Sequence, residues 1–75
     1  MRYRFIDGFE FEADTPEEIC TAIWKSMKFG FRSNLQEWME SNAKVMGEAL
    51  GRKLRTDTPE HHVVDMLKSG ILWNI

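Results

Sequence analysis

The stretch Tyr3–Glu12, YRFIDGFEFE, places an Asp-Gly pair between two runs in which apolar and polar residues alternate. This arrangement is the strongest short-range signal for a β-hairpin. We expect a type I′ turn at Asp7 and Gly8, which requires positive φ at both residues. In the second strand Phe9 and Phe11 then face the core, and the glutamates between them face water.

Opposite charges face each other across the predicted hairpin. Arg2 and Arg4 on the first strand lie where they can meet Glu10 and Glu12 on the second, and each such pair adds a few tenths of a kcal/mol. We expect these ion pairs to be solvated.

Downstream of the hairpin, three capping signals predict three helices. Thr15 and Thr58 each precede a proline, and Ser33 begins the run SNLQ, so each offers a side-chain acceptor to the first turn of a helix. Gly30 and Gly51 are the expected ends of the first and second helices. The third helix is short and reaches the Ser-Gly pair that precedes ILWNI.

Apolar residues recur at helical spacing in each segment, so each helix should bury one face. The expected inward-facing residues are Ile19, Cys20, Ile23, Ser26 and Met27 in the first helix, Leu35, Trp38, Met39, Ala43, Met46 and Leu50 in the second, and Val63, Met66 and Leu67 in the third. Asn42 falls within the second stripe and should find a hydrogen-bond partner, because an unpaired buried polar group costs about 1 to 3 kcal/mol. The sequence predicts one α+β domain over residues 1–75, with the order ββααα and a possible short strand at the C-terminal end.

Composition excludes several classes of protein. The chain has 75 residues, 43% of them hydrophobic and 29% charged, which favours one folded domain over disorder. A net charge of -2 argues against a protein that coats DNA. A single cysteine cannot form an internal disulfide, and no apolar run approaches the roughly 20 residues of a membrane span. We expect a cytoplasmic protein.

Signals for catalysis or metal binding are weak. His61, His62 and Asp65 are the first candidates for metal ligands. His61 and Asp65 stand four residues apart on one helical face, as metal ligands often do, but a third ligand would have to come from Asp57 or Cys20 without a motif-like spacing. Surface or capping roles are the competing interpretation of this group. Cys20 falls in the apolar stripe, where a thiol is usually inert. We predict no metal, no cofactor and no enzymatic activity.

Two kinds of side chain are candidates for partner binding. Acidic residues gather in the hairpin and at the start of the first helix, and the chain has more aromatic residues than a small core needs. Trp24, Phe29, Phe31 and Trp73 are the aromatics expected to be partly exposed, where they would serve as interface anchors beside arginine. The predicted partner-binding residues are Glu10, Glu12, Asp14, Glu17, Trp24, Phe29, Phe31 and Arg32.

The alternative is a nucleic-acid-binding protein. The run from Trp24 to Arg32 interleaves aromatic and basic residues, and a second basic cluster could join it in space to bind phosphate. This interpretation uses Lys25, Lys28, Arg32, Arg52, Lys53 and Arg55. The acidic hairpin would repel phosphate, which favours a protein partner.

In size, acidic hairpin and capped helices, the chain resembles small accessory proteins of phages and other mobile elements, and among them anti-CRISPR inhibitors. The resemblance covers the layout of the whole chain and carries no motif. It implies a stoichiometric inhibitor whose acidic residues, including Glu18, imitate phosphate and occupy a nucleic-acid channel of the partner. A solvated acidic face is the alternative for the same residues.

Overall fold

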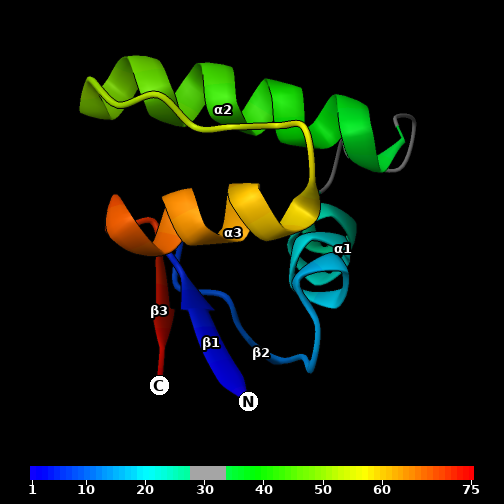
Figure 1. Ribbon diagram of the computed structural model, residues 1–75. Helices are drawn as coiled ribbons and strands as arrows, with labels where there is room; N and C mark the ends of the chain where they lie inside the picture. Colours follow the sequence, from blue (N-terminus) through cyan, green and yellow to red (C-terminus); the bar gives the residue numbers. More distant parts are fainter. Residues whose placement is uncertain (28–33) are drawn as a thin grey trace.

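A computed structural model describes residues 1–27 and 34–75. The elements are β1 (Arg2–Phe5), β2 (Glu10–Glu12), α1 (Pro16–Ser26), α2 (Leu35–Leu50), α3 (Pro59–Lys68) and β3 (Leu72–Asn74). The predicted α+β fold, with a ββααα order and a final strand, is therefore confirmed (Figure 1).

The three strands form one antiparallel sheet in the order β2-β1-β3. The predicted hairpin is present, but the predicted type I′ turn is wrong. Phe5 donates its N–H to the carbonyl of Phe9 at 2.8 Å, so three residues form the loop, and of these only Gly8 has positive φ, at 96°. Asp7 instead accepts the N–H of Phe9 through its carboxylate at 2.9 Å, which stabilises a turn that needs just one left-handed residue.

The helices begin at side-chain caps. Thr15 accepts the N–H of Glu18 at 3.1 Å and Thr58 that of His61 at 3.2 Å, as predicted. The cap of α2 is Asn34, one residue after the predicted Ser33, which lies outside the described residues.

The helix ends differ from one another. Gly51 ends α2 with a φ of 65°, as the sequence indicates. In contrast, α1 ends at Ser26, well before the predicted stop at Gly30.

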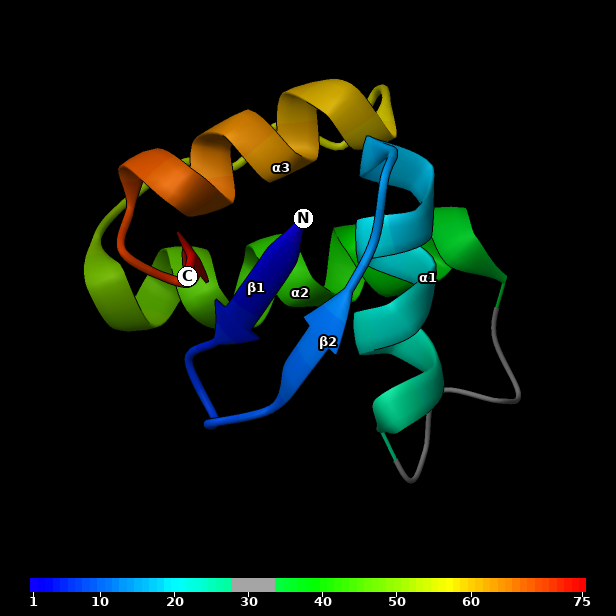
Figure 2. The same cartoon turned by 90° about the horizontal axis from the view of Figure 1, so that it is seen from below.

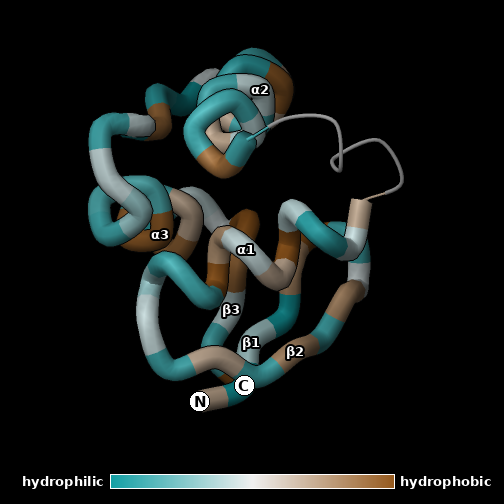
Figure 3. Tube along the Cα trace, turned by 90° about the vertical axis from the view of Figure 1, so that its right-hand side faces the viewer, coloured by the Kyte–Doolittle hydropathy of each residue, from teal (hydrophilic) through white to brown (hydrophobic). Residues whose placement is uncertain are grey.

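The elements stack in three layers, which are the strands, then α1 and α3, then α2 (Figures 1 and 3). The core between them is formed by the inner face of the sheet and the apolar faces of the helices. It comprises Tyr3, Phe5, Phe11, Ala13, Ile19, Cys20, Ile23, Trp38, Met39, Leu54, Val63, Met66, Ile71 and Leu72. Trp38 and Met39 are buried as predicted.

Four residues depart from the predicted pattern of burial. Ser26 is exposed in the last turn of α1, Leu67 is 40% exposed and Leu50 is 41% exposed, so these three lie outside the core. His62 is completely buried, although the sequence suggested a surface position. In the described ranges, no helix is long and apolar enough to cross a membrane.

Candidate interaction surface

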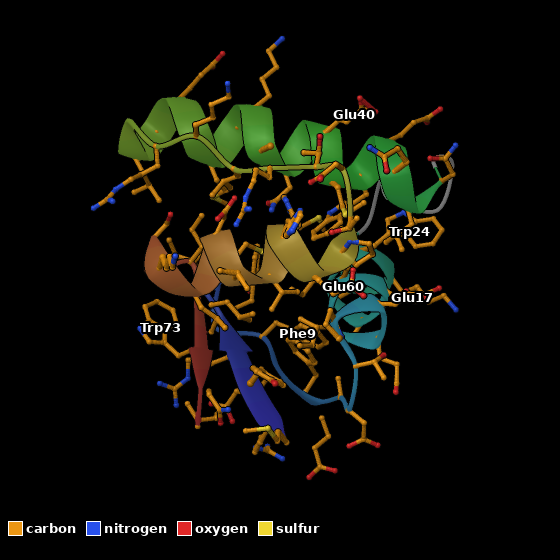
Figure 4. The ribbon with its side chains drawn as sticks, viewed as in Figure 1. Phe9, Glu17, Trp24, Glu40, Glu60 and Trp73 are labelled. Atoms are coloured by element: carbon orange, nitrogen blue, oxygen red, sulfur yellow. The ribbon has the colours of Figure 1, made fainter. Side chains whose placement is uncertain are left out.

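The outer face of the sheet carries side chains of three kinds. Glu10 and Glu12 project from β2, Arg2 and Arg4 from β1, and Trp73 from β3, and all five residues are exposed. Figure 4 shows Trp73 on the side of β3 that faces away from α1, whereas Phe9 lies between the sheet and α1. The alternation of each strand therefore separates the core from an open, chemically mixed face.

The charged residues of this face form an ion-pair ladder. Arg4 Nη2 lies 3.0 Å from Glu10 Oε2, and Arg2 lies 3.4 Å from Glu10 and 3.7 Å from Glu12. Hydrogen bonds from Arg4 and then Arg2 hold the pKa of Glu10 below its usual value. The predicted ladder is thus confirmed and is solvated, and its arginines offset the acidic charge of the hairpin.

The other predicted acidic residues lie at helix starts or at the chain end. Asp14 lies 3.7 Å from the N-terminal ammonium. Glu17 and Glu18 occupy the first turn of α1, and the starts of α1 and α3 lie side by side (Figures 1 and 2). The first turn of α3 adds Glu60 to this group (Figure 4). Sequence reasoning missed Glu60 because it is remote in the chain from Glu17.

Of the predicted aromatic anchors, the structure describes Trp24 and Trp73. Trp24 is half-buried and packs against the core. Trp73 is 43% exposed, which agrees with its predicted partial exposure. The predicted binding residues Phe29, Phe31 and Arg32 lie outside the described residues.

A shallow hollow of about 340 Å³ lies beside Trp73, between β3 and the β1–β2 turn. Arg4, Ile6, Trp73 and Ile75 line it, and the two isoleucines are 42% and 46% exposed. Tryptophan and arginine together at an apolar depression are typical of the centre of a protein interface. Strand alternation predicts which of these residues share a face within each strand, but only the pairing of β1 with β3 brings them together.

The basic residues of the nucleic-acid alternative are divided among separate places. Lys25 is exposed in the last turn of α1, while Arg52 and Lys53 follow the end of α2 that lies away from α1 (Figure 1). Arg55 donates to the Asp65 carboxylate from Nε and Nη2, both at 3.0 Å. Lys28 lies outside the described residues.

The Arg55 guanidinium and the Arg55 backbone N–H both bind the Asp65 carboxylate, the N–H at 2.8 Å. Together they lower the pKa of Asp65 to about 2. Arg55 is therefore occupied by an internal ion pair.

A buried polar cluster joins α2 to α3. His62 Nδ1 lies 2.8 Å from the carbonyl oxygen of Arg55, and His62 Nε2 lies 3.0 Å from Asn42 Nδ2. A carbonyl oxygen only accepts and an amide nitrogen only donates, so Nδ1 carries the proton and Nε2 accepts. Burial lowers the pKa of His62, which keeps the imidazole neutral. Asn42 therefore has the hydrogen-bond partner that its place in the apolar stripe required, and that partner is His62.

The residues considered for catalysis or metal binding are either buried or in contact with a neighbouring side chain. Cys20 is completely buried, and burial raises the pKa of its thiol to about 12, so the thiolate is not available as a nucleophile. His61 contacts Asp57 at 2.9 Å, while Asp65 contacts Arg55. Over residues 1–27 and 34–75, no three His, Cys, Asp or Glu side chains are grouped as metal ligands.

Comparison with known protein families, curated proteins and solved structures finds no match for this chain.

Proposed function

We propose that this chain is a small non-enzymatic protein-binding module that acts by covering a surface of its partner. The observation that carries the proposal is the exposed Trp73 beside Arg4, Ile6 and Ile75, on a sheet face that no described helix covers. Residues of this kind dominate the energy of protein interfaces when they are packed at the centre and shielded from water.

The likeness in layout to phage accessory proteins indicates which partner to test first. It favours a stoichiometric inhibitor of the anti-CRISPR type, acting in the cytoplasm on a complex that binds nucleic acid. Glu17, Glu18 and Glu60 provide a second contact in this proposal, because exposed carboxylates at neighbouring helix starts suit a basic channel.

The experiment is affinity capture with the tagged chain, followed by a binding measurement on each captured protein. Trp73→Ala should weaken binding about 30-fold, the loss typical of a hot-spot residue. Val45→Ala is the matched control, because Val45 is an apolar residue on α2 with 58% exposure and lies outside the proposed contact. Equal binding by Trp73→Ala and the parent would show that the contact is elsewhere.

A second pair of variants separates the two contacts. Reversal of Glu17 and Glu60 to lysine should slow association with a basic partner at low salt, and the difference should shrink as salt is added. If the parent instead retards labelled DNA or RNA with a steep salt dependence, and Lys53→Glu abolishes this, the nucleic-acid alternative is correct.

A further inference from the structure

The free edge of β2 carries backbone groups that the sheet does not use. Ala13 donates its N–H to the carbonyl of Met1 at 3.0 Å, so these two residues form a hydrogen-bonded pair at the end of the β1–β2 ladder. Hydrogen-bonded and non-hydrogen-bonded pairs alternate along an antiparallel ladder, which makes Phe11 the next bonded residue of β2. The N–H and C=O groups of Glu10 and Glu12 therefore point away from β1.

These outward groups are accessible. Glu10 and Glu12 are both exposed, and within residues 1–27 and 34–75 no hydrogen bond outside the sheet uses their backbone. The other edge of the sheet differs, because Leu72, whose backbone groups point outward from β3, is 1% exposed. An accessible strand edge can accept an extended segment of another chain through main-chain hydrogen bonds.

The inner side of this edge is apolar. Phe9 precedes β2, its ring stacks on that of Phe11 with 5.3 Å between the centroids, and it is only half-buried. α1 lies in the layer above the sheet and on the β2 side of it (Figures 1 and 2). A strand added at β2 would therefore place its inward residue beside Phe11 and beneath α1, where burial favours an apolar side chain.

The outer side of this edge is acidic. Glu10, Glu12 and Asp14 alternate along the chain, and the side chains of Glu12 and Asp14 are 77% and 89% exposed. The two arginines that contact the glutamates reach them from β1, on the side opposite the free edge. A row of cations beyond the free edge would continue this alternation of charge across the sheet, whereas a second copy of β2 would set carboxylate against carboxylate.

We propose that β2 accepts an extended segment of a basic partner protein, in which lysine or arginine alternates with apolar residues. In the antiparallel arrangement, two basic residues lie opposite Glu10 and Glu12 and exchange four backbone hydrogen bonds with them, while the residue between them lies opposite Phe11. The three-stranded sheet becomes four-stranded. This inference rests on the proposed protein-binding function and adds the chemistry of the partner segment.

The strand contact is compatible with the contact at Trp73. β2 and β3 are the two edges of the sheet, with β1 between them, so a segment at β2 leaves Trp73 and the hollow beside it open. The two contacts can therefore be tested separately.

The first test is titration of the chain with a short capped peptide in which lysine and valine alternate, followed by NMR of the backbone amides. The N–H signals of Glu10 and Glu12 should shift downfield and their hydrogen exchange should slow, because each N–H gains an acceptor. The N–H of Phe11, which is already bonded to β1, should change less. A peptide with glutamate in place of lysine should cause no shift, and a lysine–valine peptide that leaves both glutamate signals unchanged would contradict the proposal.

A third peptide separates strand pairing from attraction between charges. It carries the same lysines with methyl groups on their backbone nitrogens, so it keeps every charge and lacks the N–H donors that would face β2. It should leave the signals of Glu10 and Glu12 unchanged at concentrations where the lysine–valine peptide binds. Equal shifts with both peptides would overturn the proposal, because charge alone would then account for binding.

Glu12→Lys tests the acidic row in the chain itself. This variant should bind the lysine–valine peptide about 5-fold more weakly, since an attractive cross-strand pair becomes a repulsive one. Glu40→Lys is the matched control, because it makes the same change of charge at an exposed position of α2, away from the sheet (Figure 4). Circular dichroism checks that both variants fold. Equal weakening by the two variants would show that only net charge matters and would count against the strand contact.

Further measurements distinguish the strand contact from the protein-binding function on which it rests. Trp73→Ala should bind the peptide like the parent. A captured partner that loses affinity with Trp73→Ala but binds Glu12→Lys like the parent would leave the function intact and show that the strand contact is wrong. Shifts of the Glu10 and Glu12 signals with the concentration of the chain alone would show that a second copy occupies this edge, which also contradicts a basic partner segment.

Discussion

The two sides of α3 are held to their neighbours by different chemistry. Toward the sheet, the contact is apolar, with Phe5 of β1 and Leu72 of β3 both almost completely buried. Toward α2, the contact includes the hydrogen bond between Asn42 and His62, and the Trp38 ring meets the imidazole edge-on at 5.6 Å. The comparison teaches that the sheet side should respond mainly to changes of volume, whereas the α2 side should also respond to protonation.

The largest expected effect is at Trp38, the main apolar contact of α2. Trp38→Ala should lower the free energy of unfolding by about 3 to 5 kcal/mol, because it leaves a large cavity, and this is enough to unfold much of a domain of this size. Denaturant unfolding followed by circular dichroism measures the loss. Val45→Ala on the same helix should change stability by less than about 0.5 kcal/mol. A Trp38→Ala variant as stable as the parent would show that Trp38 is not the main apolar contact of α2.

A smaller loss is expected from Asn42→Ala. This change leaves the buried Nε2 of His62 without a donor, at a cost of about 1 to 3 kcal/mol. Ser41→Ala, at an exposed neighbouring position of α2, is the matched control. Urea unfolding of the three proteins at neutral pH gives the comparison, and equal midpoints would show that this hydrogen bond contributes nothing to stability.

The pH dependence of stability should distinguish the two sides of α3. The pKa of His62 is lowered from its ordinary value of 6.5 because the residue is buried, so the unfolded chain takes up a proton before the folded chain does. Stability should be complete above pH 6.5 and decrease as the pH falls from 6.5 through the lower pKa of the folded state. His62→Gln should remove this decrease in a series of urea midpoints.

Asp65 should give a second, separate decrease. Its pKa is lowered from 3.8 to about 2, mainly by Arg55, so the stability it contributes is present above pH 3.8 and is lost as the pH falls toward 2. Asp65→Asn should remove this second step and leave the first. A single step that both variants abolish would contradict the assignment to two groups.

The smallest effect is expected at the ion-pair ladder of the outer sheet face. Arg4→Gln should leave the unfolding midpoint close to that of the parent, because exposed ion pairs contribute little to stability and are screened by salt. Thermal unfolding at low and high salt measures it. If Arg4→Gln were clearly less stable than the parent, and added salt lowered the stability of the parent by a similar amount, the sheet side would also depend on charge.

The sequence predicted local structure better than it predicted burial. The Asp7-Gly8 pair and the threonine caps are local signals, since each acts within a few residues, and they placed the hairpin and two helix starts correctly. The turn type was wrong because the Asp7 side chain took part in it. His61 and His62 are adjacent and chemically identical, so only the packing of α2 on α3 determines which of them is buried.

The candidate surface was predictable in part. Arg2, Arg4, Glu10 and Glu12 follow from strand alternation and from the expected ladder. The hollow at Trp73 depends on the pairing of β1 with β3, for which the sequence has no turn or cap signal, because the two strands are separated by all three helices.

That same separation affects how the chain folds. The central strand β1 lies near one end of the sequence and its partner β3 near the other, so their pairing must close a loop that contains nearly every other residue. Long-range pairing of this kind slows folding and tends to form late. A substitution such as Leu72→Val should therefore accelerate unfolding while changing the folding rate little, whereas changes within the β1–β2 hairpin should act on the folding rate.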